Sequence, residues 1–279
     1  GRDLSRVSLS VKHPNVGDTS IVVAGRDIVQ PTVRNVATGA LSSATSTGIV
    51  IEGPGDVSFL AGRDIDLGTS AGIVSAGSTR DPRLGDTGAS ITLIAGLESS
   101  ASIAEFVRQS VAENSVHAES LAAYLDALRQ SGRTIDADLP PATQFERLDL
   151  RDQVAFVADV FLDELQASGV AASDPASPDF ENYTRGFDAI AALFDGTDYA
   201  GDVRTPLSTV QTQAGGSIRV LVPGGLVDAG LSATEALGSN FKSDKELGFI
   251  VFREGDIKAF VNDSFNVNST RVFAQQGGD

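Results

Sequence analysis

Two different periods of apolar and polar positions divide the chain. Short runs that alternate apolar and polar residues cover residues 20–30, 48–60, 61–68 and 88–96, and similar runs return after residue 204. Each run ends at Gly, Asp, Asn or Pro. Period-2 alternation between turn residues is typical of short β-strands. The pattern therefore predicts an all-β region towards each end of the chain.

The predicted strands begin in a recurring way. Residues 22–30 read VVAGRDIVQ and residues 59–67 read FLAGRDIDL, so a Gly-Arg-Asp corner at Gly25 returns at Gly62, with a weaker copy at Gly1. Glycine adopts positive φ without steric cost, which lets the chain turn before a strand begins. Because a solenoid stacks like residues on one another, these copies favour a β-solenoid over a β-sandwich. Their unequal spacing predicts loops of different length between coils.

The middle of the chain follows a helical period instead. Apolar residues fall at helical spacing in residues 100–132, 148–169 and 178–196, with Gly132 and Gly169 as expected ends of the first two helices. Ser102 and Glu105 have the spacing of a capping box. About 100 residues are too many for a structureless loop. We therefore expect β-helix coils at 1–98 and 204–279, interrupted by a helical insertion at 99–203.

Charge and aromatic residues are unevenly distributed. The chain carries 37 acidic and 21 basic residues, a net charge of −16, and residues 99–203 hold 19 of the acidic but only 6 of the basic residues. The acidic side chains are expected on the solvent faces of the helices. The aromatic side chains of the third helical stretch are expected to seal that helix against the β-helix. These are Phe180, Tyr183, Phe187 and Phe194.

The composition excludes several classes of function. Phosphates and anionic membrane surfaces attract basic rather than acidic proteins, so nucleic-acid binding and membrane docking are not expected. No apolar run approaches the ~20 residues that cross a bilayer, so membrane insertion is not expected either. Cysteine is absent, which excludes disulfides and thiolate zinc sites. No cofactor or metal is expected.

Three segments carry a resemblance to a known family. Residues 182–194 read NYTRGFDAIAALF, residues 215–225 read GGSIRVLVPGG, and residues 255–279 read GDIKAFVNDSFNVNSTRVFAQQGGD. In this order, together with the repeated AGRDI, they resemble the filamentous haemagglutinin family, the large bacterial exoproteins of two-partner secretion. In that family the last segment continues into further strands, so this chain is expected to be a fragment that ends within a coil.

The resemblance implies both a fold and a role. The fold is a right-handed parallel β-helix, exported through an outer-membrane secretion partner to the cell surface. The role is adhesion or biofilm contact, with a glycan or protein of a host or neighbouring cell as the partner. The resemblance supplies no catalytic residue, and we expect that the chain is not an enzyme. The insertion would be the element presented by the β-helical shaft.

Two sets of residues are candidates for ligand binding. If the corners stack, Arg2, Arg26 and Arg63 form a ladder beside neighbouring aspartates, which predicts a self-neutralising row. An alternative is that Arg26 and Arg63 hold an acidic glycan. Tyr183 and Arg185 could line a groove between the insertion and the β-helix, because clefts between subdomains are favoured binding sites.

The residues suited to catalysis are few. His13 and His117 are the only histidines and both are expected on the surface, which leaves no His-centred triad or multi-His metal site. Asp64 and Asp66 alternate along a strand and would stand ~7 Å apart on one face. That separation is compatible with glycoside hydrolysis by paired carboxylates.

Alternative functions follow from these observations. A glycan-active β-helix enzyme could use Asp64 with Asp66, or Glu254 with Asp256, although aspartates after Gly-Arg are more simply turn residues. A third reading gives the insertion a role in dimerisation or capping only. Unpaired strands at the ends of the coils predict some self-association.

Overall fold

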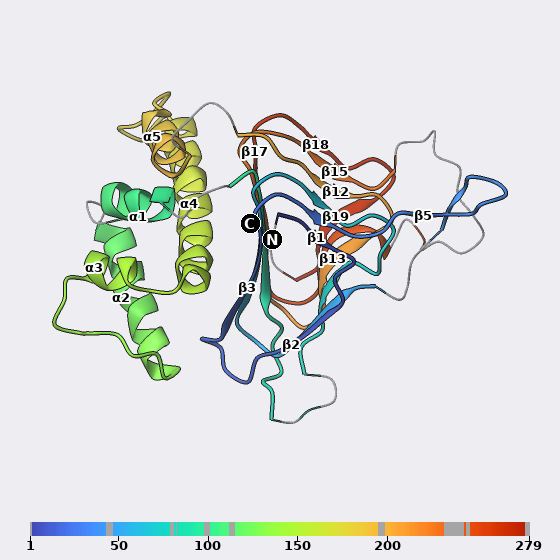
Figure 1. Ribbon diagram of the computed structural model, residues 1–279. Coiled ribbons are helices and arrows are strands. Elements are labelled where there is room, and N and C mark those ends of the chain that lie inside the picture. Colours follow the sequence, from blue (N-terminus) through green and yellow to red (C-terminus); the bar gives the residue numbers. More distant parts are fainter. Residues whose placement is uncertain are drawn as a thin grey trace. The chain divides into compact units, whose positions relative to one another are not determined.

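The computed structural model divides the chain into two compact units (Figure 1). It describes residues 2–42, 47–78, 81, 83–97, 101–111, 115–194, 199–231, 243 and 246–276, without the side chains of 101, 102, 110, 115 and 116. The coil unit comprises Gly1–Glu98 and Asp198–Asp279, and the helical unit comprises Ser99–Thr197. The chain returns to the coil unit at Asp198 rather than at residue 204, because β12 (Val203–Thr205) already pairs with β9 (Ile65–Asp66).

Three parallel sheets, which we name A, B and C, form the coil unit. Sheet A contains β1 (Leu4–Ser5), β4 (Ile28–Val29), β9, β12, β15 (Val227–Ala229) and β18 (Phe265–Asn266). Sheet B contains β2 (Leu9–Lys12), β7 (Ile49–Glu52), β10 (Ile73–Ser75), β13 (Thr209–Thr212), β16 (Gly248–Val251) and β19 (Arg271–Ala274). Sheet C contains β3 (Thr19–Ala24), β8 (Asp56–Ala61), β11 (Ser90–Ala95), β14 (Ile218–Val222) and β17 (Ile257–Val261).

The chain visits these sheets in turn, and we call one pass through A, B and C a coil. Each strand pairs in parallel with its counterpart one coil away; in Figure 1 the labels β12, β15 and β18 follow one another in this order. This arrangement of mostly parallel sheets is compatible with a parallel β-helix. Parallel pairing also explains why the sequence shows short alternating runs without hairpin turns between them.

Two insertions account for the irregular spacing of the corners. An antiparallel hairpin of β5 (Val33–Arg34) and β6 (Leu41–Ser42) follows β4 and projects from the coils in Figure 1. The helical unit is inserted between β11 and β12. The two ends of this insertion meet, since a Cβ added at Gly201 would lie 2.9 Å from the backbone nitrogen of Gly96.

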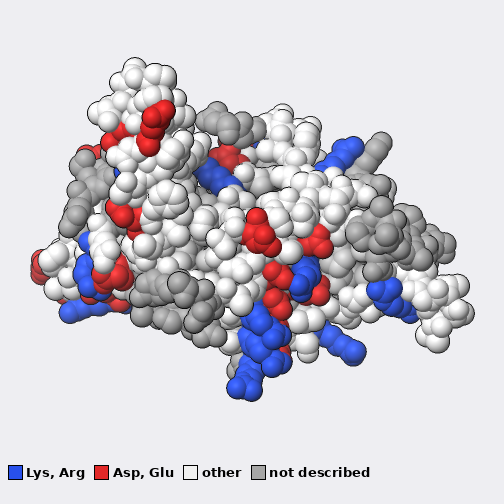
Figure 2. Space-filling view, turned by 90° about the horizontal axis from the view of Figure 1, so that it is seen from above, with Lys and Arg blue, Asp and Glu red and all other residues white. Residues whose placement is uncertain are grey.

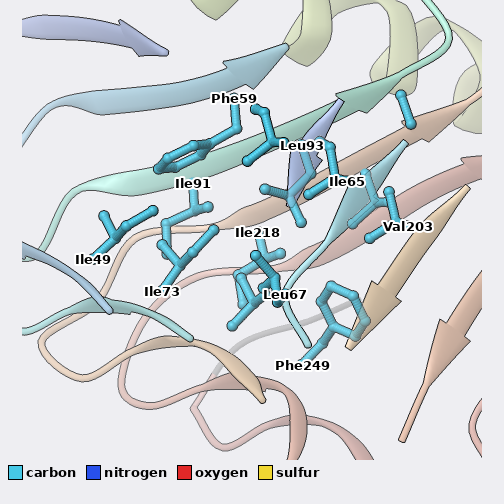
Figure 3. Packing of buried hydrophobic residues seen from close by; sticks show 14 of the residues in the cluster. Ile49, Phe59, Ile65, Leu67, Ile73, Ile91, Leu93, Val203, Ile218 and Phe249 are labelled. Carbon is cyan, nitrogen blue, oxygen red and sulfur yellow. The ribbon is translucent and has the colours of Figure 1, made fainter. Parts of the chain in front are cut away.

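The core of the coil unit is a set of stacked apolar columns. On sheet C, Phe59 pairs with Leu93 and Leu93 with Val220, and all three side chains are fully buried. On sheet A, Ile65 pairs with Val203 in the same way. Figure 3 shows the side chains of Phe59, Leu93, Ile65 and Val203 pointing into the space between the sheets. Because each side chain packs on its counterpart one coil away, the core needs few aromatic residues.

The helical unit packs around aromatic side chains. Its elements are α1 (Ala101–Phe106), the π-helical segment η1 (Val107–Val111), α2 (Ser115–Gln130), α3 (Pro141–Glu146), α4 (Leu150–Ser173) and α5 (Thr184–Leu193). Phe161 of α4 lies at the centre, with its ring centroid 5.9 Å from that of Phe106 and 5.4 Å from that of Phe194, both edge to face. No described helix is long and apolar enough to cross a membrane.

The helix boundaries correct the sequence predictions in part. The end of α2 at Gly132 is confirmed: Gly132 has φ of 93° and its N–H donates to the carbonyl of Arg129, while the N–H of Arg133 donates to that of Leu128. Ser102 is not an N-cap, because α1 already includes Ala101. Gly169 does not end α4, which continues to Ser173 because its buried stripe extends to Ala172.

Candidate functional site

The Gly-Arg-Asp corners stack on successive coils, as predicted. The backbone N–H of Arg26 donates to the carbonyl of Arg2 at 2.6 Å, and that of Arg63 donates to the carbonyl of Arg26 at 2.7 Å. The corner leaves no room for a side chain at its first position, since a Cβ added at Gly62 would lie 2.4 Å from the carbonyl oxygen of Gly25. Close stacking of backbone on backbone therefore explains the repeated glycine.

Each arginine binds the aspartate of the preceding coil. Arg63 donates from Nε and Nη2 to the two carboxylate oxygens of Asp27, at 2.9 and 2.6 Å. Arg26 makes the same fork with Asp3. These hydrogen bonds lower the pKa of Asp3 and raise the pKa of Arg63. The predicted self-neutralising row is confirmed at these positions, and on the face shown in Figure 2 basic and acidic side chains lie next to one another.

Each aspartate also binds the backbone of the following coil. The N–H of Asp64 donates to Asp27 at 3.2 Å, that of Asp202 donates to Asp64 at 3.0 Å, and that of Leu226 donates to Asp202 at 2.9 Å. The side-chain row continues from Asp64 to Asp202 across the helical insertion. Of the four residues predicted to bind a ligand, Arg26 and Arg63 bind carboxylates within the coil unit. The other two, Tyr183 and Arg185, belong to the helical unit.

Of the carboxylates considered for catalysis, Asp64 and Asp66 are hydrogen-bonded within the coil unit. Asp64 binds Arg63 and the backbone of Asp202. Asp66 accepts from the N–H of Gly68 at 2.8 Å, and burial raises the pKa of Asp66. Glu254 and Asp256 lie in the connection between β16 and β17. Over the part of the chain that the structure describes, no group of three His, Asp or Glu residues is placed to hold a metal ion.

His13 is buried, and its surface prediction was wrong. Only 4% of the residue is exposed, with Nδ1 2.9 Å from the carbonyl oxygen of Pro54 and Nε2 2.8 Å from Ser20 Oγ. A carbonyl only accepts, so Nδ1 of His13 donates to Pro54, and Nε2 is hydrogen-bonded to the Ser20 hydroxyl. The corner of the next coil covers this histidine: a Cβ added at Gly53 would lie 1.9 Å from the His13 carbonyl oxygen. The His13 ring therefore connects the corners of two successive coils through Ser20 and Pro54.

A buried ionic cluster joins three helices. Glu164 of α4 is 4% exposed; its Oε2 lies 2.6 Å from Nε2 of His117 on α2 and 2.7 Å from Nη2 of Arg185 on α5, whose Nε binds Oε1. Burial raises the pKa of Glu164, but the hydrogen bonds from Arg185 and His117 outweigh this effect and hold the pKa below its ordinary value. His117 and Glu164 are both buried, so the predictions that placed them on the surface were wrong. Each is a hydrogen-bond partner of the other, which permits the burial of both.

The same cluster positions the first turn of α5. Its N-cap residue, Tyr183, makes no side-chain cap. Instead Ser168 Oγ of α4 accepts the N–H of Gly186 at 3.0 Å, and the Asn182 side chain accepts the N–H of Thr184 at 3.1 Å. These contacts satisfy N–H groups that a helix start leaves unpaired. Together with Arg185, they hold the start of α5 on α4.

Three aromatic side chains beside this turn are exposed. Phe187 is 68% exposed, Tyr183 51% and Phe180 43%, and we call these three residues the aromatic surface. Within the helical unit only Phe194 of the four predicted residues is buried, edge to face with Phe161. That these side chains seal the helix against the β-helix stays a prediction. The buried face of α5 consists instead of Gly186, Ala189, Ala192 and Leu193. Small residues there let α5 lie close to α4 and leave the aromatic rings on its outer face.

Some of these roles had a signal in the sequence. Gly201-Asp202-Val203 repeats the Gly-polar-apolar pattern of the corners, so the return of the chain to the coils could have been found from it. No comparable pattern marks His13, His117, Glu164 or Ser168, whose partners are distant in sequence. Comparisons with known proteins add nothing to this assignment, since no family model, curated protein or solved structure matches the chain.

Proposed function

We propose that this chain is a segment of a secreted bacterial surface adhesin similar to the filamentous haemagglutinins. In this proposal the coil unit is a right-handed parallel β-helix that acts as a shaft, and the helical unit is the element it presents for adhesion or biofilm contact. The right-handed sense follows from the strong preference of parallel crossover connections. The sequence segments at 182–194, 215–225 and 255–279 support the family.

One structural observation carries the proposal. The pairing of all three sheets continues across the insertion without a shift, from β9 to β12, β10 to β13 and β11 to β14. The helical unit is therefore an addition at one corner, and the coils do not depend on it for their register. A shaft that keeps its hydrogen bonding while carrying an inserted unit suits a protein that displays binding elements at a distance from a surface.

The alternative of a glycan-active enzyme gains no support from the geometry. Its best pair, Asp64 and Asp66, is occupied by backbone N–H groups and by Arg63. The third reading, in which the insertion serves dimerisation or capping only, is distinguished by the experiment below.

The test compares the intact chain with a variant in which residues 99–197 are replaced by a short Gly/Ser linker. Because the ends of the insertion meet at Gly96 and Gly201, the coils are expected to fold without it. Both proteins are coated on beads and applied to a glycan array and to cultured epithelial cells. Binding by the intact chain that disappears with the insertion supports the proposal. Equal binding by both folded proteins contradicts the role of the insertion.

The surface location is tested separately. Antibodies raised against the chain should label intact cells of the producing bacterium, and added protease should remove the signal. Labelling only after the cells are permeabilised would contradict export.

The bead experiment has its own control. Circular dichroism of the intact chain and of the linker variant confirms that any loss of binding does not result from unfolding.

A further inference from the structure

The packing described above for the helical unit does not explain why the three side chains of the aromatic surface are exposed. Tyr183 and Phe187 lie four residues apart, and the N–H of Phe187 donates to the carbonyl of Tyr183 at 3.2 Å, so both rings are on one face of α5. Phe180 lies in the turn just before this helix. Exposed aromatic groups of this kind mark interaction sites more often than isolated exposed residues do.

The surroundings of the aromatic surface are acidic. Asp174, Asp179, Glu181 and Asp188 lie within the same stretch, and Arg185 is the only basic residue between positions 174 and 194. Arg185 binds Glu164 through two hydrogen bonds, and its charge also attracts the nearby Asp179. A partner that approaches the aromatic rings therefore meets several carboxylates and one basic side chain, which is already hydrogen-bonded to Glu164.

The aromatic surface is also held in place from behind. Arg185, Gly186 and Thr184 are tied to α4 and the preceding turn by the contacts described above. Glu181, between Phe180 and Tyr183, has φ of 61°, and its N–H donates to the carbonyl of Ala172 at 2.8 Å. Binding to a surface that is already ordered loses less conformational entropy.

From these observations we propose that the aromatic surface binds a cationic amphipathic segment of a partner protein. The inference rests on the proposed adhesive function, because it assigns a partner class to the presented helical unit. Apolar side chains of the segment pack on Phe180 and Phe187. Its Lys or Arg side chains lie over the aromatic faces and pair with the carboxylates of Asp179 and Asp188.

Charge decides between this partner and the other possible occupants. A second copy of the chain also carries a net charge of −16, so two such acidic surfaces facing each other repel. A neutral glycan could stack on the rings, but it would make no use of the surrounding negative charge. An acidic glycan would be repelled. Only a basic partner uses both the rings and the carboxylates.

The test measures binding of a synthetic Lys/Leu amphipathic peptide that contains one Trp. The protein has no Trp, so the fluorescence change comes from the peptide alone. The intact chain should bind it, with an affinity that falls as salt is added. A peptide with Glu in place of Lys should not bind. Failure of the intact chain to bind the Lys/Leu peptide overturns the proposal.

Matched variants separate the aromatic surface from the overall negative charge. Tyr183→Ser with Phe187→Ser should weaken binding at least tenfold, whereas Val16→Ser with Val36→Ser, at exposed apolar positions of the coil unit, should leave it unchanged. Asp179→Asn with Asp188→Asn should weaken binding and its salt dependence. The control Asp136→Asn with Asp138→Asn has the same net charge and should bind like the intact chain. Equal effects of target and control pairs contradict the proposal.

Other outcomes assign another occupant. Binding of chitohexaose that is lost in the Tyr183 and Phe187 variant would replace the peptide by a neutral glycan. Self-association that is lost in this variant, measured by sedimentation velocity, would replace it by a second copy. If bead adhesion requires residues 99–197 but survives the Tyr183 and Phe187 substitutions, this inference fails while the proposed function stands.

Discussion

Single polar side chains hold the corners of the coils, where the backbone turns from one sheet to the next. Asp27 accepts from the Arg63 guanidinium and from the backbone of Asp64, and His13 links Pro54 to Ser20. Some backbone N–H groups at these corners bond the backbone of the neighbouring coil, but others, such as that of Asp64, bond a side chain instead. The residues that do this are short or rigid, which limits the entropy lost on ordering them.

Replacing Asp27 tests this role. Asp27→Ala removes a buried carboxylate that accepts from the partly buried N–H of Asp64 and from the Arg63 guanidinium. We expect a loss of about 1–3 kcal/mol in the free energy of unfolding, the usual cost of an unsatisfied buried group. Urea unfolding followed by circular dichroism measures it. Asp3→Ala, on the exposed first coil, is the control and should change stability little; an equal loss in both variants would contradict the interpretation.

Two glycines provide a contrasting pair. Gly62→Ala places a Cβ 2.4 Å from a backbone oxygen of the preceding coil, and we expect a destabilisation of about 1–3 kcal/mol from the forced shift. Gly169→Ala lies inside α4 with no atom within 4 Å of the new Cβ, and should stabilise the protein by about 0.5–1 kcal/mol through helix propensity. Thermal unfolding checks both. The same sign of change in the two variants would show that stacking space is not what separates them.

At the scale of elements, helices and strands are joined by few but well-buried polar contacts. In the helical unit, Glu164 connects α2, α4 and α5 through His117 and Arg185. The position of α5, and with it the direction of the aromatic surface, depends on this cluster. A buried carboxylate without its partners would be costly, so the three residues act as a unit.

The cluster predicts a pH dependence. The pKa of Glu164 in the folded protein lies below its ordinary value of 4.5, so its stabilising contribution is complete above 4.5 and is lost as the pH falls through the folded pKa. Glu164→Gln should lower stability at pH 7 by about 2–3 kcal/mol, less than for a fully buried pair because Arg185 is partly exposed. Its stability should also fall less between pH 5 and pH 3 than that of the parent chain, by urea unfolding at 222 nm. Parallel pH profiles of the two proteins would refute this.

At the scale of the whole molecule, the coils form a linear stack whose outer strands pair on one side only within the described residues. β2 pairs with β7, and the N–H groups of Leu9 and His13 donate to that neighbouring coil. The N–H of Ser10 points away from β7, because successive residues of a strand alternate in direction. Such an edge can template pairing with another chain.

Ser10→Pro tests end-to-end association. Proline removes the N–H that faces away from the coils without removing a bond to β7. We expect that the parent chain associates with rising concentration in sedimentation velocity, that Ser10→Pro associates less, and that both unfold at the same urea concentration. Association that is unchanged in Ser10→Pro would place the contact elsewhere.

Local signals in the sequence predicted much of the architecture. The apolar columns, the glycine corners and the Arg–Asp row could be anticipated, because alternation, turn geometry and repeated corner residues are written within a few positions. The helical middle was evident from its period, although the helix boundaries predicted from Ser102 and Gly169 differ from those of α1 and α4. Gly201-Asp202-Val203 carried the pattern that places the return of the chain earlier than residue 204.

What the sequence alone determined is therefore the repeating local geometry: where strands and helices form, and which side of each strand is buried. Only the tertiary structure decided that His13, His117 and Glu164 are buried, since a polar group is buried when a distant segment supplies its partner. The same holds for the aromatic surface. Its residues have helical spacing that suits burial, but Gly186, Ala189 and Ala192 allow a closer contact on the opposite face, and that contact turned the aromatic rings outward.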